Sequence, residues 1–188
     1  MYNLRTIKAR HASILVIIVS LVFVIPTGAI MTSNSYSSTI KFAYGQTGQT
    51  NSNSANSTNI QNIPANKVHV GDIDIAYKIF GKGHPILLIT GAEMPMVIWP
   101  QSILNQLALN HTVIIFDNRG VGNTTSGTKA FSIQQFTNDT NGLLDALKIP
   151  KADVLGFSLG SLIAQELTIT HPEKVNKLVL YGSSCGGR

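Results

Sequence analysis

The stretch DVLGFSLGSLIAQ, residues 153–165, places a Gly-x-Ser-x-Gly pattern between a short apolar run and a helical pattern. In a strand–turn–helix context this pattern predicts a nucleophile elbow, a sharp turn that lifts a serine hydroxyl above the end of a sheet. Gly156 and Gly160 are expected because a β-carbon at either position would meet the neighbouring strand or helix. Ser158 is therefore the candidate nucleophile, and the alternative is an ordinary glycine-rich turn.

Apolar runs of strand length surround this stretch. They are PILLIT (85–90), TVIIF (112–116), DVL (153–155) and KLVLYG (177–182). Unbroken runs of this length are typical of strands buried on both faces of a parallel sheet. Before them, KVHVGDIDIAYKIFGKG (67–83) alternates apolar and polar residues on both sides of Gly71 and Asp72, which predicts a strand pair with a tight turn.

Helical patterns lie between the predicted strands, at residues 102–110, 132–148 and 159–170. The second begins with Ser132 and Gln135 at the spacing of a capping box, and His171-Pro172 ends the third. Strands that alternate with helices predict an α/β fold, here a doubly wound, mostly parallel sheet with right-handed crossovers.

The N-terminal segment, residues 1–45, is expected to be a signal peptide or a membrane anchor. Three basic residues precede the apolar run at residues 14–25, and no charged residue occurs between Arg10 and Lys41. A basic flank before a short apolar run is typical of a secretory signal, and about 20 apolar residues can also span a bilayer. Both alternatives place the rest of the chain outside the cytoplasm, secreted or membrane-anchored, with membrane contact through this segment.

Residues 46–66 are uncharged and rich in Asn, Ser, Thr and Gln, which predicts a flexible linker. The folded domain is then expected at residues 67–188. The chain carries 14 basic and 9 acidic residues, and three of the basic ones, Arg5, Lys8 and Arg10, precede the N-terminal apolar run. Without a basic cluster in the domain, a nucleic-acid partner is not expected. No metal-ligand spacing occurs, so neither a metal nor a cofactor is expected.

From residue 67 to residue 182 the chain resembles the α/β-hydrolase superfamily, in the group of esterases, peroxidase-like hydrolases and proline iminopeptidases. The resemblance rests on four segments in order: PILLITGAEMP (85–95), IIFDNRGVGNT (114–124), DVLGFSLGS (153–161) and HPEKVNKLVLYGS (171–183). It implies a serine hydrolase that acts on a carboxylic ester or related small-molecule acyl substrate, and the N-terminal segment predicts that this hydrolase is exported. Asp117 and Arg119, in the second segment, are expected to brace their loop by hydrogen bonds.

The resemblance also assigns an oxyanion hole to the backbone N–H groups of Ala92 and Leu159. The family has His before the glycine of the first segment, where this chain has Thr90 followed by Gly91. Backbone donors survive a change of side chain, so the oxyanion hole is still expected. The loop GAEMPMVIWP (91–100) that carries Ala92 is either core packing or a pocket wall.

The resemblance implies a triad in the chain order Ser, then Asp or Glu, then His. After Ser158 the sequence offers only Glu166, His171 and Glu173, on or just past the helix that follows the elbow. We therefore expect the catalytic acid and histidine to be missing from this chain, which resembles an N-terminal portion that ends after about the sixth strand. That strand is expected to leave an unpaired apolar edge.

The chain alone is then expected to be inactive, because a serine without its base is a weak nucleophile. The alternative is a catalytically inactive binding domain of the same fold, or a non-functional truncated fragment.

Overall fold

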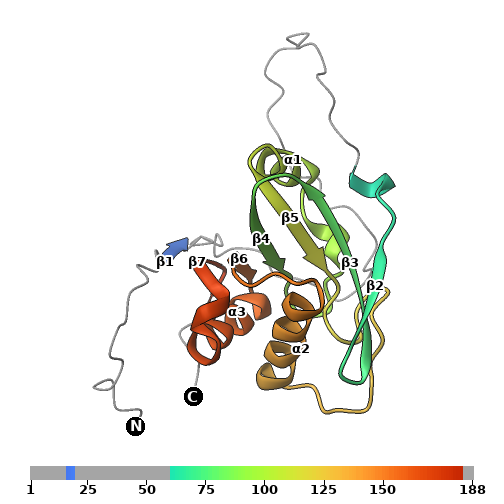
Figure 1. Cartoon of the computed structure of the whole chain (residues 1–188). Coiled ribbons are helices and arrows are strands. Elements are labelled where there is room, and N and C mark those ends of the chain that lie inside the picture. The colour runs from blue at the N-terminus through green and yellow to red at the C-terminus, as the bar shows by residue number, and fades with distance from the viewer. Residues whose placement is uncertain (1–15, 20–59, 184–188) are drawn as a thin grey trace, which may run out of the picture. The chain divides into compact units, whose positions relative to one another are not determined.

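The computed structural model describes residues 16–19 and 60–183 of the 188, as a sheet with helices on both faces (Figure 1). The strands are β1 (Val16–Val19), β2 (Asn66–Val70), β3 (Ile73–Gly81), β4 (His84–Ile89), β5 (His111–Phe116), β6 (Ala152–Phe157) and β7 (Val175–Tyr181). Their order in the sheet is β1-β7-β6-β4-β5-β3-β2. All neighbours are parallel except β3, which is antiparallel to β2 and β5. The predicted doubly wound, mostly parallel α/β fold is confirmed.

Helices cover both faces of the sheet. They are α1 (Gln101–Ala108), α2 (Ile133–Ala146) and α3 (Leu159–Thr170), with the short 3-10 helices η1 (Ile60–Asn62), η2 (Met96–Ile98) and η3 (Pro172–Lys174). Side chains of α2 and α3 pack in one core cluster, and side chains of α1, η1 and η2 pack in a second. The sheet therefore lies between two helical layers, with two separate cores.

Strand β4 shows why the predicted strands have continuous apolar runs. Leu87 and Ile89 lie in the core on the α2 and α3 side, whereas Ile86 and Leu88 lie in the core on the α1 side. Successive side chains of a strand point to opposite faces, so a strand covered on both faces needs apolar residues at every position.

Two local features fix helix α2. The Ser132 hydroxyl accepts a hydrogen bond of 3.1 Å from the backbone N–H of Gln135, as the capping-box spacing predicts. Farther along, Gly142 faces β2, where a β-carbon would lie 2.4 Å from Cγ1 of Val70. The glycine therefore allows the helix to lie close against the hairpin.

The structure differs from the expectations at two places near the N terminus. Ile60, within the stretch predicted to be a linker, is only 3% exposed and packs in the α1-side core. Val16–Val19 pairs in parallel with β7, so the expected unpaired edge of β7 is wrong. The apolar edge accepts a segment of four β-branched residues, which favour strands. The remainder of residues 1–45 and residues 46–59 lie outside the described residues.

Among the helices of residues 60–183, none is long and apolar enough to cross a membrane.

Candidate active site

The candidate site lies where the order of the strands reverses. β4 is flanked by β5 on one side and by β6 on the other, so the loops after these three parallel strands emerge at the same edge. In open α/β sheets this switch point is where ligands bind. The register pairs Ile89 with Gly156, which brings the loop after β4 beside the elbow after β6.

Ser158 has the strained backbone expected of a nucleophile elbow. Its φ of 52° and ψ of −117° lie outside the regions that residues with side chains favour. Such a conformation costs on the order of 1–3 kcal/mol and persists only where the surroundings impose it. Ser158 is exposed and stands directly before the first residue of α3. Beside it, the ring of Phe157 stacks on Tyr181, with 5.2 Å between ring centroids.

Close packing of glycines imposes this turn. A β-carbon on Gly156 would lie 2.3 Å from the backbone oxygen of Gly160 and 2.6 Å from Cα of Ser161. These distances are far below van der Waals contact, and both partners are backbone atoms of α3. The strand and the helix can therefore meet at this angle only with glycine at position 156.

The loop after β4 lies against the elbow. A β-carbon on Gly91 would be 3.2 Å from Cβ of Ser158. Ala92 follows Gly91 and is exposed, and Leu159 follows Ser158 as the first residue of α3. The structure thus brings together the two segments that carry the predicted oxyanion donors, while the role of their N–H groups remains a prediction.

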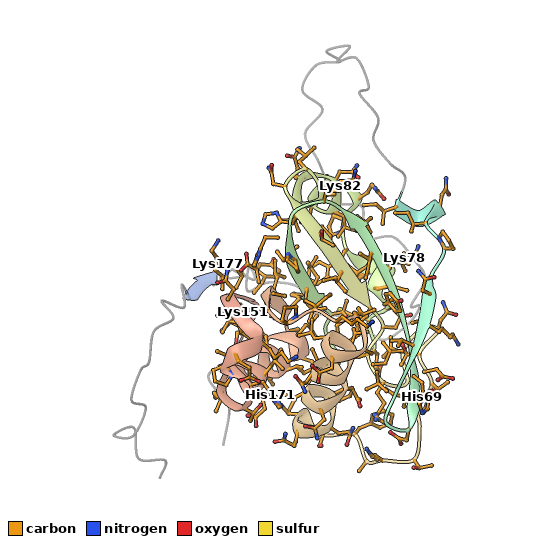
Figure 2. All side chains as sticks on the ribbon, in the orientation of Figure 1. His69, Lys78, Lys82, Lys151, His171 and Lys177 are labelled. Carbon is orange, nitrogen blue, oxygen red and sulfur yellow. The ribbon has the colours of Figure 1, made fainter. Side chains whose placement is uncertain are left out.

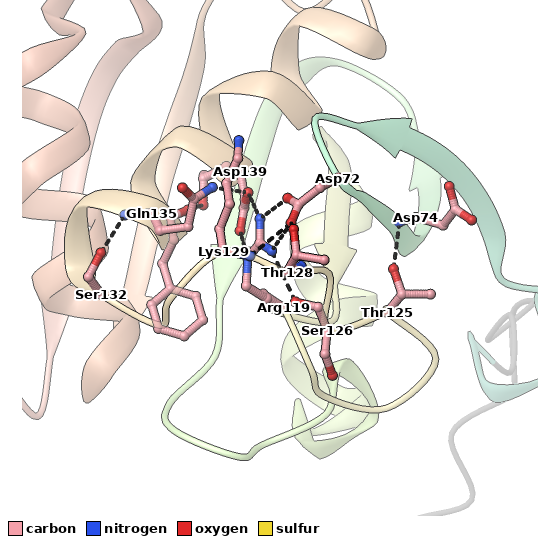
Figure 3. Close-up of polar contacts among 12 residues, drawn as sticks. Asp72, Asp74, Arg119, Thr125, Ser126, Thr128, Lys129, Ser132, Gln135 and Asp139 are labelled. Atoms are coloured by element: carbon pink, nitrogen blue, oxygen red, sulfur yellow. Dashed lines mark hydrogen bonds and ion pairs between the residues drawn. The ribbon is translucent and has the colours of Figure 1, made fainter.

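Arg119 holds the loop after β5 in place (Figure 3). This residue is 2% exposed, and its guanidinium donates to Asp139 at 2.7 and 2.8 Å and to Asp72 at 2.8 and 3.2 Å. The hydrogen bonds from Arg119, followed by that from the Thr128 amide, hold the pKa of Asp72 far below its ordinary value. The two carboxylates, Asp139 first, raise the pKa of Arg119 further. The network braces the loop after β5, as expected.

The histidines of residues 60–183 lie away from the elbow. His84 and His111 are the first residues of β4 and β5, at the end of the sheet opposite the elbow. His69 lies on the outer hairpin strand and His171 at the far end of α3, which at 1.5 Å per residue is about 18 Å long (Figure 2). Their polar partners are, in the same order, Asp153, the Leu107 carbonyl, Asp74 and Glu173. No described histidine can therefore act as the base for Ser158.

The loop that carries Ala92 contributes to core packing, while its role as a pocket wall remains a prediction. Met96 is 2% exposed and belongs to the α1-side core, whereas Val97 and Ile98 are 59% and 48% exposed.

Among the described residues, no group of three or more His, Cys, Asp and Glu side chains could hold a metal ion.

Comparison with known proteins gives a consistent family. The sequence model of the family described as alpha/beta hydrolase fold matches residues 84–186. A protein of Mycobacterium tuberculosis named "Putative non-heme bromoperoxidase BpoC" is 38% identical over 109 residues, which cover 57% of this chain and 41% of that protein. The 2-hydroxymuconate semialdehyde hydrolase of Pseudomonas sp. strain CF600 is 34% identical over 132 residues, which cover 65% of this chain and 47% of that enzyme.

A solved structure shows the same fold. The alpha/beta hydrolase fold protein from Chitinophaga pinensis superimposes with a TM-score of 0.63 at 30% identity, over 67% of this chain and 46% of that one. The chain spans less than half of the length of each of these three proteins.

Proposed function

Because the chain belongs to the alpha/beta hydrolase fold family, we propose that it carries the nucleophile half of a serine hydrolase acting on a carboxylic ester or related acyl substrate. The observation that carries this proposal is the strained backbone of Ser158, in contact with the loop of Gly91. A serine at the elbow favours acyl transfer. It argues against branches of the superfamily that use aspartate at this position.

In the proposed reaction the Ser158 hydroxyl oxygen attacks the acyl carbonyl, and its proton passes to a histidine base. The carbonyl oxygen becomes an oxyanion that accepts hydrogen bonds from the N–H groups of Ala92 and Leu159. Removal of one such donor in a serine hydrolase typically costs about 3 kcal/mol of transition-state stabilisation. Collapse of the intermediate expels the alcohol, which takes the proton from the histidine. Water then hydrolyses the acyl-serine by the same steps.

The acid and the histidine of this triad are proposed to lie outside the 188 residues. The positions of the described histidines support this, because each of them lies far from Ser158. Without them Ser158 reacts slowly at neutral pH, since nothing accepts its proton.

The test uses a fluorophosphonate probe, which labels activated serines, on the protein purified from its source cells. We expect one probe per protein molecule and loss of labelling in Ser158→Ala. Ser126→Ala, a change at another exposed serine, is the matched control and should label as the wild type does. A folded protein that resists the probe would instead be a binding domain of this fold.

We also propose that the domain works outside the cytoplasm, exported or anchored through residues 1–45. The basic flank and the apolar run at residues 14–25 support this proposal. The intact mass of the native protein tests it together with the triad. If the measured mass is smaller than the mass predicted from the gene, and the difference equals the mass of the leader, the leader is cleaved. A measured mass well above 20.2 kDa indicates further residues that can supply the acid and the histidine.

A further inference from the structure

We propose that Asp117 and Asn118 are positioning residues that fix both ends of the loop formed by residues 90–96, called here the oxyanion loop. The two residues are consecutive and directly follow β5, next to the strand that carries the loop. The proposal rests on the proposed function, since the purpose assigned to the loop is to aim the N–H of Ala92 at the substrate.

Asn118 holds the beginning of the loop. Its side-chain NH₂ donates to the carbonyl oxygen and to the hydroxyl oxygen of Thr90, both at 3.3 Å. Asn118 is 3% exposed and Thr90 is fully buried, so water does not compete for these bonds. The same carbonyl lies against the elbow, because a β-carbon on Gly160 would be 2.6 Å from it. The carbonyl of Thr90 is thus held between α3 and Asn118.

The hydroxyl of Thr90 is a second acceptor for the side-chain amide of Asn118, beside the Thr90 carbonyl. At position 90 the α/β-hydrolase superfamily has histidine. Here the hydroxyl of Thr90 supplies a hydrogen-bond acceptor to Asn118. The amide can reach the backbone oxygen and the side-chain oxygen of one residue at the same time. Thr90 and Asn118 therefore work as a pair, and a change at either one should loosen the same segment.

Asp117 holds the end of the loop. One carboxylate oxygen accepts from the backbone N–H of Met96 at 2.6 Å, and the other accepts from the backbone N–H of Asn123 at 2.9 Å. Asp117 is 2% exposed, and hydrogen bonds to a buried carboxylate are stronger than those between neutral groups. The side chain of Met96 is also in the core, so the end of the loop is held both by the hydrogen bond to Asp117 and by core packing.

The middle of the loop has little support of its own. Ala92 and Glu93 are exposed, and Glu93 has a left-handed backbone with φ of 57°. The backbone hydrogen bond inside the loop, from the N–H of Met94 to the carbonyl oxygen of Gly91, is long at 3.4 Å. The direction of the Ala92 N–H therefore depends on how firmly the two ends are held.

The first test is amide hydrogen exchange of the native protein and of Asn118→Ala and Thr90→Val. Removal of a neutral hydrogen bond is expected to raise the exchange rate of the Met94 and Met96 amides about fivefold or more, while the strands β5 and β6 keep their protection. Thr90→Ser, which retains the hydroxyl, should restore most of what Thr90→Val loses. Unchanged exchange in both Asn118→Ala and Thr90→Val would overturn the proposal.

The second test is the rate of fluorophosphonate labelling of the same variants. Misaligned donors should slow labelling about 10-fold, less than the roughly 10²- to 10³-fold that loss of a whole donor costs. Asn176→Ala, at the opposite end of the sheet, is the control expected to label at the wild-type rate. Faster exchange with an unchanged labelling rate would overturn the positioning role. If the wild type is not labelled at all, the proposed function fails, and exchange alone decides whether the loop is fixed: Asn118→Ala reports on its beginning, and Asp117→Ala reports on its end through the Met96 amide.

Discussion

Gly160 of the elbow helix stands directly against the carbonyl of Ile89 at the end of β4. A β-carbon on Gly160 would lie 2.2 Å from that oxygen. The neighbouring strand and the helix after the elbow therefore touch backbone to backbone. The oxyanion loop begins at the next residue, so this contact also sets where the loop leaves the sheet.

Replacement of Gly160 by alanine should lower the free energy of unfolding by about 3 kcal/mol or more, because backbone on both sides must shift. Gly142→Ala is the matched control. There the β-carbon meets the side chain of Val70, and alanine favours the helix by about 1 kcal/mol, so a smaller loss is expected. Chemical denaturation of both variants measures the difference. Equal stabilities would contradict the close packing.

Ser158→Gly should stabilise the domain relative to Ser158→Ala by about 1 kcal/mol. Glycine adopts the positive φ of this position without steric cost, whereas alanine keeps the strain. Neither variant can be labelled by a fluorophosphonate. The midpoint of urea denaturation gives the comparison, and a glycine variant no more stable than the alanine variant would show that the elbow stores no strain.

Arg119→Lys should destabilise the domain by about 3 kcal/mol. The lysine keeps the charge but cannot reach both carboxylates with paired hydrogen bonds, which leaves buried acceptors unsatisfied. Lys174→Gln is the control, because it removes the ion pair with Asp145, whose side chain is 55% exposed. Because the carboxylate remains largely in water, such a pair contributes about 1 kcal/mol or less. A similar loss in both variants would contradict the bracing role of Arg119.

The domain should lose stability as the pH falls below about 4, in part through Asp72. The pKa of Asp72 in the folded state is held far below the ordinary 3.8 by Arg119 and the Thr128 amide. Below pH 3.8 the unfolded chain therefore takes up a proton that the folded chain does not, so unfolding is favoured. Denaturation of wild type and Asp72→Asn between pH 3 and pH 7 measures the effect. The stability of the variant should depend less steeply on pH.

Ser132→Ala should cost about 1 kcal/mol of stability, because the N–H of Gln135 loses its acceptor at the start of α2. Ser132→Asp, which keeps an acceptor, should retain most of the wild-type stability. Thermal unfolding of the two variants checks the cap, and an alanine variant that melts with the wild type would show that water replaces the hydroxyl.

Periodicity predicted the fold well because the sheet is buried on both faces. The helix after the elbow begins at Leu159 and ends at Thr170, as expected from the pattern and from Pro172. Ile60 was missed because a lone apolar residue in a polar tract gives no pattern, although tertiary packing buries it.

The site could be predicted only in its local parts. The elbow is contiguous in sequence, so Ser158 and its glycines were identified as candidates from the sequence. The contact between Asn118 and Thr90 joins side chains 28 residues apart, and no spacing rule predicts it. The sequence pointed to this contact only through Thr90, which stands where the α/β-hydrolase superfamily has histidine.

The guanidinium of Arg119 ties together the turn between β2 and β3, the loop after β5, and α2. An outer strand usually frays first, as an independent flap. Here β2 cannot peel away without withdrawing Asp72, which leaves buried N–H groups of the Arg119 guanidinium without that acceptor. The hairpin and the helix are thereby held in one cooperative unit, so β2 does not fray and expose β3 as a new edge strand.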